Sequence, residues 1–255
     1  MVLNGEIRRA RVRAYYENNP LMVSSPFGGI DGINEPLLEQ VLDRLDIRLE
    51  GQRILDVGCG RGFAGDFVRK SGGTYSGVDF VQSRGGFPFV MGDAAKLPFA
   101  DGSFDGVFCI DAFEHFPEAG GAASEFYRVL RPGGWVFLSV PNYSNVAGVV
   151  KFCCERWGAY RPMTWAPFRR WQPQEYERPL TAGFVRRAFR GAGFVRMRRI
   201  GYGAEAGLGL FPWVAHPQMP EWAQFRIERL FAAAGPAIVR VWPGASLHQF
   251  WKIER

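Results

Sequence analysis

Three glycines at alternate positions follow a short apolar segment that contains one acid. They are Gly58, Gly60 and Gly62, and Asp56 lies just before them in the stretch RILDVGCGRG. Glycines behind a strand allow the backbone to approach a ligand closely, and a helix that follows offers its free amide groups. The residue types and their spacing therefore indicate a ligand-binding loop.

The acid and the glycine spacing restrict the chemistry of that ligand. A dinucleotide-binding fingerprint, G-x-G-x-x-G, would need its third glycine where this chain has Phe63. At close range Asp56 would repel a pyrophosphate, whereas it would attract an ammonium group. S-adenosylmethionine carries an ammonium group and a sulfonium, and it has no phosphate. The loop therefore favours S-adenosylmethionine over a nicotinamide dinucleotide.

Two further acids follow the next two apolar runs along the chain. Asp79 ends the run TYSGVD, twenty-one residues after Gly58, close to the offset of about 20 residues at which an acid contacts ribose hydroxyls. Asp93 ends FVMGD, where its carboxylate can accept a hydrogen bond from an adenine amino group while the amide of Ala94 faces the ring. One such acid alone is more typical of a turn. Three at successive strand ends favour a nucleoside site.

Short apolar runs must position these residues. The runs RILDV, TYSGVD, FVMGD, GVFCID and WVFLSV are bounded by Gly, Pro and Asp. Runs that are apolar on both faces and separated by helices or loops are typical of buried parallel strands in an α/β sheet. Helical spacing predicts helices over residues 36–45, 123–131 and 180–189, the last capped by Thr181.

The connection between the second and third runs is short. Only residues 80–88 separate Asp79 from the run that begins at Phe89, whereas a parallel crossover usually needs a dozen or more residues and a helix. We expect the crossover helix to be absent, which leaves one side of the ligand site open. Phe80 or Phe87 could cover the ligand in its place.

Over residues 54–142 the motifs resemble a known family. ILDVGCGRG, GVD, GDAAKLPFADGSFDGVFCIDAFEHF and RVLRPGGWVFLSVPN are similar to the successive motifs of class I S-adenosylmethionine-dependent methyltransferases, in particular the type 11 group that includes quinone-biosynthesis enzymes. The resemblance implies a Rossmann-like, seven-stranded, mostly parallel sheet with an antiparallel terminal hairpin. It also implies S-adenosylmethionine as cofactor and S-adenosylhomocysteine as product.

The resemblance assigns expected roles at the ends of the strands. Gly58 and Gly60, with Asp56 and Cys59 beside them, would contact the methionine part of the cofactor. The remaining cofactor-binding candidates are Asp79 and Phe80 for the ribose and its surroundings, Asp93 and Ala94 for the adenine, and Asp111 beside the methionine part and the incoming acceptor.

Two additions to the sheet are the expected source of acceptor specificity. The first, residues 143–179, interleaves aromatic residues with arginines and can form a lid or a plain packed cap. Its acceptor-binding candidates are Tyr160, Trp165 and Arg169. The second spans about 202–244 and contains a predicted helix over 221–234 without a clean apolar stripe, so we favour packing over the active-site mouth, with interfacial membrane contact as the alternative.

These additions fit one methyltransferase domain over residues 1–255. We expect a terminal antiparallel hairpin formed by FVRMRRI and SLHQFWKIE. The parts of the domain are N-terminal helices over 1–50, a cofactor-binding core over 51–142, the lid or cap over 143–179, and the rest of the sheet with its insertion over 180–255.

Two adjacent residues after the fourth run are candidates for proton transfer. Methyl transfer needs an acceptor held in line with the sulfonium methyl group, and a general base helps when the acceptor is a hydroxyl. His115 is the first candidate and Glu114 the second, with His216 a weaker one. A histidine that only starts a helix and bonds to the backbone is an equally good interpretation of His115.

Three classes of function fit these residues. The leading one is methylation, mainly on oxygen, of a small molecule such as a sugar, polyketide, quinone-like or lipid-linked acceptor. A methyltransferase acting on RNA or protein is supported by basicity alone, since no NPPY-type tetrapeptide and no separate RNA-binding module occur. A non-catalytic protein that binds S-adenosylmethionine would keep the same cofactor motifs.

Composition sets the expected environment. The four cysteines lack paired metal-ligand spacing, so we expect reduced thiols, no metal and a cytoplasmic location. No apolar run approaches the roughly 20 residues that cross a bilayer, which leaves interfacial contact as the only membrane association expected. The net charge of +6 is too modest to imply a nucleic-acid partner. The sequence does not indicate an oligomeric state.

Overall fold

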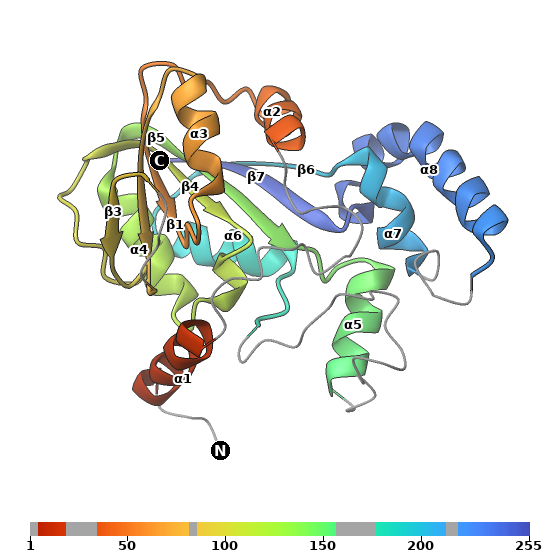
Figure 1. Ribbon diagram of the computed structural model, residues 1–255, viewed down its shortest axis with the longest axis horizontal. Helices are drawn as coiled ribbons and strands as arrows, with labels where there is room; N and C mark the ends of the chain where they lie inside the picture. The colour runs from red at the N-terminus through yellow and green to blue at the C-terminus, as the bar shows by residue number, and fades with distance from the viewer. Residues whose placement is uncertain (1–4, 19–34, 82–85, 157–176, 213–218) are drawn as a thin grey trace.

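The computed structural model describes residues 5–18, 35–81, 86–156, 177–212 and 219–255. These residues form a seven-stranded sheet of order β3-β2-β1-β4-β5-β7-β6, covered by helices on both faces (Figure 1). β1 to β5 are parallel, and β7 pairs antiparallel to both β5 and β6. The strands are β1 (Arg53–Val57), β2 (Thr74–Asp79), β3 (Phe89–Met91), β4 (Phe104–Ile110), β5 (Leu130–Pro141), β6 (Arg196–Ile200) and β7 (His248–Glu254).

This sheet confirms the predicted fold class and the predicted terminal hairpin. β6 and β7 lie inside the two segments expected to pair, with Ile200 opposite Phe250. Helix α5 follows β5, and α7 and α8 follow β6, as the insertions required. The helices are α1 (Gly5–Asn18), α2 (Glu35–Arg44), α3 (Phe63–Lys70), α4 (Ala119–Val129), α5 (Val146–Arg156), α6 (Ala182–Gly191), α7 (Ala206–Leu210) and α8 (Glu221–Val241), with short 3-10 turns η1 (Phe113–His115), η2 (Gly203–Glu205) and η4 (Pro243–Ala245).

Alternating strand residues build one core on each face of the sheet. Ile54 and Phe108 point toward α2 and α3, whereas Leu55 and Val107 point toward α4 and α6. Thr181 caps α6 by accepting a hydrogen bond from the Phe184 amide, as predicted. Both faces of the central strands are therefore buried, which explains their continuous apolar runs.

Two helix ends differ from the prediction. α4 ends at Val129 rather than at Arg131, because Leu130 already pairs with Phe104 as the first residue of β5. α8 continues to Val241 past Pro236, seven residues beyond the predicted end at residue 234. Helical spacing did not reveal this extension because proline normally ends a helix.

The connection between β2 and β3 is as short as the sequence predicted. β2 ends at Asp79 and β3 begins at Phe89, and the two strands pair in parallel. Of the connecting residues, the described ones, 80–81 and 86–88, are not helical. The face that carries α2 and α3 thus lacks a crossover helix among the described residues at this edge of the sheet.

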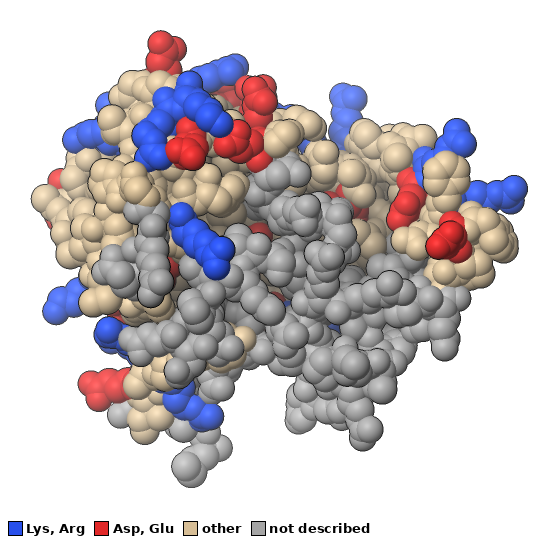
Figure 2. All heavy atoms as spheres, viewed as in Figure 1, with Lys and Arg blue, Asp and Glu red and all other residues tan. Residues whose placement is uncertain are grey.

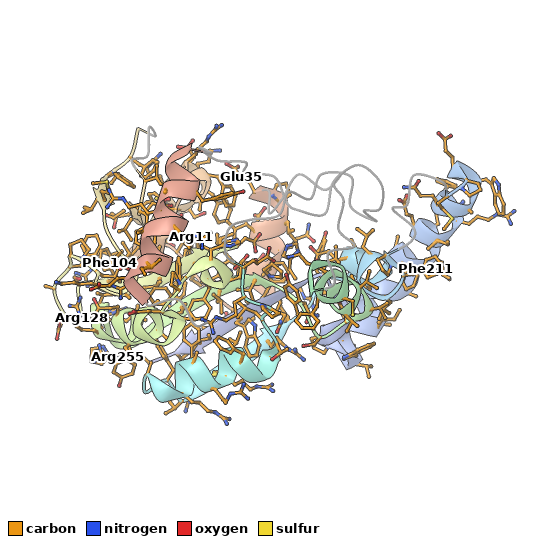
Figure 3. All side chains as sticks on the ribbon, turned by 90° about the horizontal axis from the view of Figure 1, so that it is seen from below. Arg11, Glu35, Phe104, Arg128, Phe211 and Arg255 are labelled. Atoms are coloured by element: carbon orange, nitrogen blue, oxygen red, sulfur yellow. The ribbon has the colours of Figure 1, made fainter. Side chains whose placement is uncertain are left out.

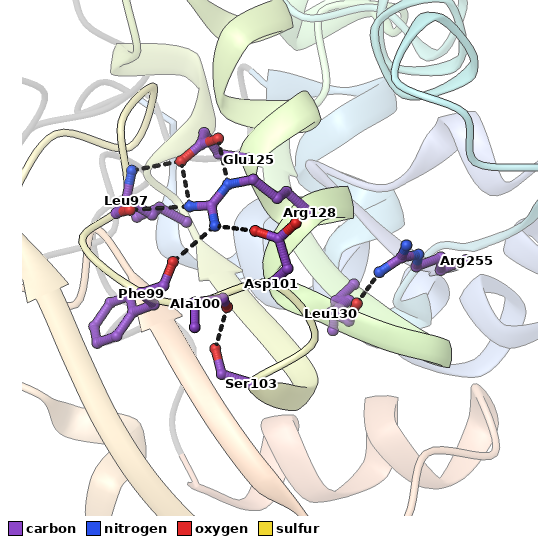
Figure 4. A network of polar contacts seen from close by, with 9 residues as sticks. All are labelled: Leu97, Phe99, Ala100, Asp101, Ser103, Glu125, Arg128, Leu130 and Arg255. Carbon is purple, nitrogen blue, oxygen red and sulfur yellow. Dashed lines mark hydrogen bonds and ion pairs between the residues drawn. The ribbon is translucent and has the colours of Figure 1, made fainter.

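The loop between β3 and β4 is fastened to α4 by Arg128 (Figure 4). Its guanidinium donates hydrogen bonds to the carbonyl oxygens of Leu97 and Phe99, at 3.0 and 2.7 Å. It also pairs with the carboxylates of Glu125 and Asp101. One arginine on α4 thereby holds both the helix and the segment that leads away from β3.

Replacing Arg128 by alanine should lower the free energy of unfolding by about 1 to 3 kcal/mol, because several charge-assisted hydrogen bonds are lost at a partly exposed site. Urea unfolding measures this loss. Arg190→Ala, at an exposed arginine of α6, is the control and should stay within about 0.5 kcal/mol of the parent. Equal losses in both variants would contradict a fastening role for Arg128.

Candidate cofactor and acceptor site

The glycine loop after β1 needs glycine for its backbone shape. Gly58, Gly60 and Gly62 have φ angles of 76°, 52° and 71°, in the left-handed region that other residues rarely adopt. A Cβ on Gly58 would lie 2.5 Å from the Cβ of Ala112. The alternate spacing therefore puts a glycine at each of the three positions before α3 where the backbone is left-handed.

Asp79 lies against this loop. Its Oδ2 accepts a hydrogen bond from the Gly60 amide at 2.9 Å, and its Oδ1 accepts one from the Val81 amide at 3.3 Å. Burial raises the pKa of Asp79 despite these hydrogen bonds. The structure thus brings the acid at the end of β2 and the glycine loop together, as a shared nucleoside site requires.

Asp56 is buried beneath the loop. Its Oδ2 accepts a hydrogen bond from the hydroxyl of Tyr75 at 2.6 Å. Burial raises the pKa of Asp56 to about 7, although the Tyr75 hydroxyl acts in the opposite direction. Cys59 is also buried, and burial raises the pKa of its thiol, so this cysteine is held as an unreactive thiol. The side chains of Asp56 and Cys59 thus support the loop from below.

Phe87 fills part of the space where a crossover helix would lie. Its ring packs edge-on against Tyr75, with the ring centroids 5.3 Å apart. A Cβ on Gly62 or Gly77 would lie within 3 Å of the same ring. Of the two phenylalanines considered as a cover for the adenine, Phe87 packs under the loop, and Phe80 lies half-buried beyond β2. A covering role for either one stays a prediction.

The third acid lies beside the N-terminal helix. Oδ1 of Asp93 accepts a hydrogen bond from the Ala95 amide at 2.8 Å, while Ala94 is buried. Nε of Arg9 on α1 lies 3.7 Å from Oδ2 of Asp93, and the guanidinium of Arg9 also pairs with Glu118. α1 therefore lies next to the part of the site that the sequence assigned to adenine.

Asp111 follows the last residue of β4 and has a strained conformation. Its φ angle is 47°, which is uncommon for a residue with a Cβ. Its amide donates to the carbonyl oxygen of Ser139, and its Oδ1 accepts from the Ser139 hydroxyl at 2.7 Å. One hydrogen bond thus fixes the backbone of Asp111 and the other fixes its carboxylate, both against Ser139 of β5.

A buried histidine of β7 lies behind Asp111. Nδ1 of His248 lies 2.6 Å from Oε1 of Glu205, and its Nε2 lies 3.8 Å from Oδ2 of Asp111. Oε2 of Glu205 accepts hydrogen bonds from the Ser246 hydroxyl and the His248 amide. Burial alone would lower the pKa of His248, but Glu205 and Asp111 raise it to about 9. His248 is therefore an imidazolium at neutral pH.

The two proton-transfer candidates differ in their surroundings. Glu114 is buried, and burial together with the Asp111 carboxylate raises its pKa well above the usual range, which disfavours its charged form. His115 is 11% exposed, with its Nε2 3.6 Å from Oε1 of Glu114. Its amide also donates to the Ala112 carbonyl. These environments favour His115 over Glu114 as a proton acceptor.

A second buried ion pair lies near His115. The ammonium of Lys151 on α5 pairs with Glu177, and both contact the hydroxyl of Tyr143. Burial opposes ionisation of Glu177, yet Lys151 and, to a smaller extent, His115 hold its pKa below the usual value. The carboxylate of Glu177 is therefore a fixed negative charge on the His115 side of the site.

The sequence did not reveal this second layer of the site. Glu205, His248, Lys151 and Glu177 lie far apart in the chain and match no motif. Lys151, Glu205 and His248 are polar residues within mainly apolar segments, whereas the segment around Glu177 is itself polar. The acceptor candidates Tyr160, Trp165 and Arg169, and also His216, lie outside the described residues.

Comparison with known proteins places this geometry in a family. Residues 55–138 match the family described as a methyltransferase domain, type 11. These residues carry a type 11 methyltransferase domain. Over 115 residues, 39% of the chain, it is 39% identical to "Methyltransferase GfsG" of Streptomyces halstedii, and over 144 residues, 51% of the chain, it is 31% identical to the "Ubiquinone biosynthesis O-methyltransferase" of Paracidovorax citrulli. These matches cover only 41% and 53% of the two relatives.

A solved structure extends the likeness of this methyltransferase domain to the whole chain. It is the Burkholderia thailandensis 1,6-didemethyltoxoflavin-N1-methyltransferase with bound 1,6-didemethyltoxoflavin and S-adenosylhomocysteine. The TM-score is 0.54 at 16% identity, and the match covers 100% of this chain and 91% of that one. The likeness confirms the fold. S-adenosylmethionine is the cofactor of the family, and the described residues fit it, since a left-handed glycine loop, whose backbone a ligand can approach closely, lies against the Asp79 carboxylate.

Proposed function

We propose that this protein transfers the methyl group of S-adenosylmethionine to an oxygen atom of a small-molecule acceptor. The observation that carries the proposal is the meeting of the glycine loop, Asp79 and Asp111 at the carboxyl ends of β1, β2 and β4, with His115 a few residues beyond. S-adenosylmethionine supplies an electrophilic methyl group when bound. The chain then has to hold the acceptor in line and take up one proton.

In this proposal, the described residues divide the work. Asp79 accepts from the ribose hydroxyls, and the left-handed glycine loop lets the methionine part approach the backbone closely. His115 takes the proton of the acceptor hydroxyl, since burial and the Asp111 carboxylate disfavour the charged form of Glu114. Glu177 stabilises the imidazolium that forms at His115, because its carboxylate is a fixed negative charge on that side.

Oxygen as the acceptor atom is supported by two points. A general base helps when the acceptor is a hydroxyl, and His115 is the last residue of η1, with its side chain 11% exposed. One matched relative is named as an O-methyltransferase. A methyltransferase acting on RNA or protein, or a non-catalytic binding protein, would use the same cofactor residues.

Transfer of labelled methyl groups tests the proposal. The purified protein is incubated with labelled S-adenosylmethionine and a lysate, which is then separated into small molecules, lipids, RNA and protein. Label in the small-molecule or lipid fraction that mild base removes identifies a methyl ester. Label that resists mild base and is identified in an ether shows methylation of a hydroxyl oxygen. Label in RNA or protein, or cofactor binding without transfer to any fraction, would contradict the proposal.

Asp79→Ala should weaken S-adenosylhomocysteine binding about tenfold to a hundredfold, because a charged acceptor for the ribose hydroxyls is worth about 1.5 to 3 kcal/mol. Titration calorimetry measures the dissociation constant. Asp66→Ala removes an acid of α3 whose side chain is 72% exposed, and it should bind like the parent. An unchanged dissociation constant in Asp79→Ala would mean that Asp79 supports the loop and does not bind the cofactor.

A further inference from the structure

Helix α8 extends away from the sheet and buries little of its surface (Figure 1). Of its residues, Gly235 and Val239 are the buried ones. Three large apolar side chains in its first half are mostly exposed, with fractions of 67% for Trp222, 59% for Phe225 and 62% for Leu230. A helix that leaves such side chains in water has an apolar surface without a partner among the described residues.

The apolar surface continues beyond the first half of α8. Val241 and Trp242 are exposed at its C-terminal end. Phe211 is exposed where α7 ends, and it lies at the α8 end of the molecule, opposite Phe104 and Arg128 (Figure 3). α7 packs against both α8 and α5, so the three helices form one end of the protein.

Helix α5 adds to this end of the molecule. Val149 and Phe152, one turn apart, are exposed by 54% and 48%. We call the exposed apolar side chains of α5, α7 and α8 the helical end. It is defined by Val149, Phe152, Phe211, Trp222, Phe225, Leu230, Val241 and Trp242.

Arginines accompany the aromatic side chains of α8. The guanidinium of Arg226 lies 5.8 Å from the ring centroid of Trp222, and that of Arg229 lies 5.6 Å from the ring centroid of Phe225. At about 100° of rotation per residue, both arginines point to the side of Trp222. Blue basic and red acidic side chains both lie beside tan surface at this end of the molecule (Figure 2).

The acids of α8 lie at one edge of this surface. On the same wheel Glu221 and Glu228 fall roughly 100° or more from Trp222 but are neighbours of Phe225. Glu228 accepts a hydrogen bond from Gln224. The side of α8 that carries Trp222 and Leu230 therefore combines apolar and positively charged groups.

This combination matches an anionic lipid surface better than a protein surface. Aromatic rings enter the boundary between headgroups and acyl chains, and arginines extend from the same depth to lipid phosphates. A protein partner would have to offer carboxylates interleaved with apolar pockets at the same spacing. Within the described residues, no helix is long and apolar enough to cross a bilayer, so the helix would lie along the membrane.

We propose that the helical end binds the surface of an anionic lipid bilayer, with α8 lying in the interface. α5 follows β5 and carries Lys151, which pairs with Glu177 near His115. Binding would thus bring the acceptor side of the domain to the membrane, where an amphiphilic acceptor is concentrated. That consequence rests on the proposed function, whereas binding to lipid does not.

Vesicle sedimentation tests the proposal with two lipid compositions. The full-length protein should bind vesicles of phosphatidylcholine mixed with phosphatidylglycerol, and bind vesicles of phosphatidylcholine alone at least tenfold more weakly. Arg226→Gln with Arg229→Gln should weaken binding to the mixed vesicles about tenfold or more, since each arginine near an anionic surface adds about one kcal/mol, or roughly fivefold. Raised salt should weaken the parent more than this variant.

A second variant tests the apolar contribution. Trp222→Ala, Phe225→Ala and Leu230→Ala together should weaken binding at least tenfold. The matched controls lie on β6 and just before it, where Val195→Ala and Arg196→Gln with Arg198→Gln remove an apolar side chain and charges that are equally exposed. These controls should bind vesicles like the parent.

Three results would overturn the proposal. The first is absence of binding to the anionic vesicles, and the second is equal binding by the α8 variants and the β6 controls. The third is a parent protein that self-associates and that the apolar variant converts to monomers, because the helical end would then be an interface between copies. Calorimetry with S-adenosylhomocysteine on the same variants separates this test from the proposed function, because cofactor affinity should not change.

Discussion

Replacing Glu205 by alanine is expected to destabilise the protein by about 3 to 5 kcal/mol. Glu205 is buried, and it accepts from the Ser246 hydroxyl and from both the ring and the amide of His248. Removing one partner of a buried ion pair leaves a charge without compensation, which costs far more than losing a surface pair. Urea unfolding of the parent and the variant measures the difference.

Two control variants separate charge from burial. Glu205→Gln keeps an oxygen for Ser246 and removes the negative charge, so its loss should be smaller than that of the alanine variant. Glu118→Ala breaks the surface pair with Arg9, whose side chain is 38% exposed, and should cost less than about 1 kcal/mol. Equal losses in Glu205→Ala and Glu118→Ala would contradict a buried ion pair.

The same pair gives stability a defined dependence on pH. The folded protein raises the pKa of His248 from 6.5 to about 9, so the folded state binds this proton more tightly than the unfolded chain does. The contribution is therefore complete below about pH 6.5 and is lost as the pH rises through 9. The free energy of unfolding should fall over this window in the parent and fall much less in Glu205→Ala. A flat profile in the parent would show that His248 is neutral.

Replacing His115 by alanine is expected to lower turnover about a hundredfold or more on a hydroxyl acceptor, while cofactor affinity stays within a factor of a few. This is the signature of a lost proton transfer. The pH dependence of turnover should also lose one ionisation in the histidine range, which a displaced acceptor would not cause. Steady-state kinetics over a range of pH, with calorimetry of S-adenosylhomocysteine, gives both results.

Glu114→Gln is the matched variant for His115→Ala. Because burial and the Asp111 carboxylate disfavour the charged form of Glu114, an uncharged amide at this position should retain turnover to within about tenfold. A large loss in Glu114→Gln with near-normal turnover in His115→Ala would reverse the two roles. Near-normal turnover in both would mean that methyl transfer here depends on positioning alone.

The arrangement of the proposed cofactor half was predictable because local rules determine it. Its residues lie near the carboxyl ends of β1 to β4, and in a parallel sheet the carboxyl ends of neighbouring strands meet at one edge. Asp79 and Gly60 were therefore expected close together, and they share a hydrogen bond. The short connection before Phe89 was equally readable, since nine residues leave too little room for a crossover helix.

The acceptor half was not predictable from local rules. Glu205 and His248 are brought together by an insertion after β6, and Lys151 and Glu177 by one after β5. Insertions follow no shared pattern, and their pairing depends on how each one folds back on the sheet. The sequence also predicted that α8 packs over the mouth of the site. The helix packs against η2, which carries Glu205, extends away from the sheet and continues past Pro236.

The left-handed backbone at Asp111 limits how this position can change in evolution. Residues with a branched or bulky Cβ are strained at a φ of 47°, whereas aspartate and asparagine tolerate it. The Ser139 hydroxyl also needs an oxygen acceptor at this reach. Glycine tolerates the left-handed backbone but offers no oxygen acceptor. Glutamate offers an acceptor but does not tolerate the backbone. Sequence drift at this position is therefore confined to aspartate and asparagine by geometry, before any selection on chemistry begins.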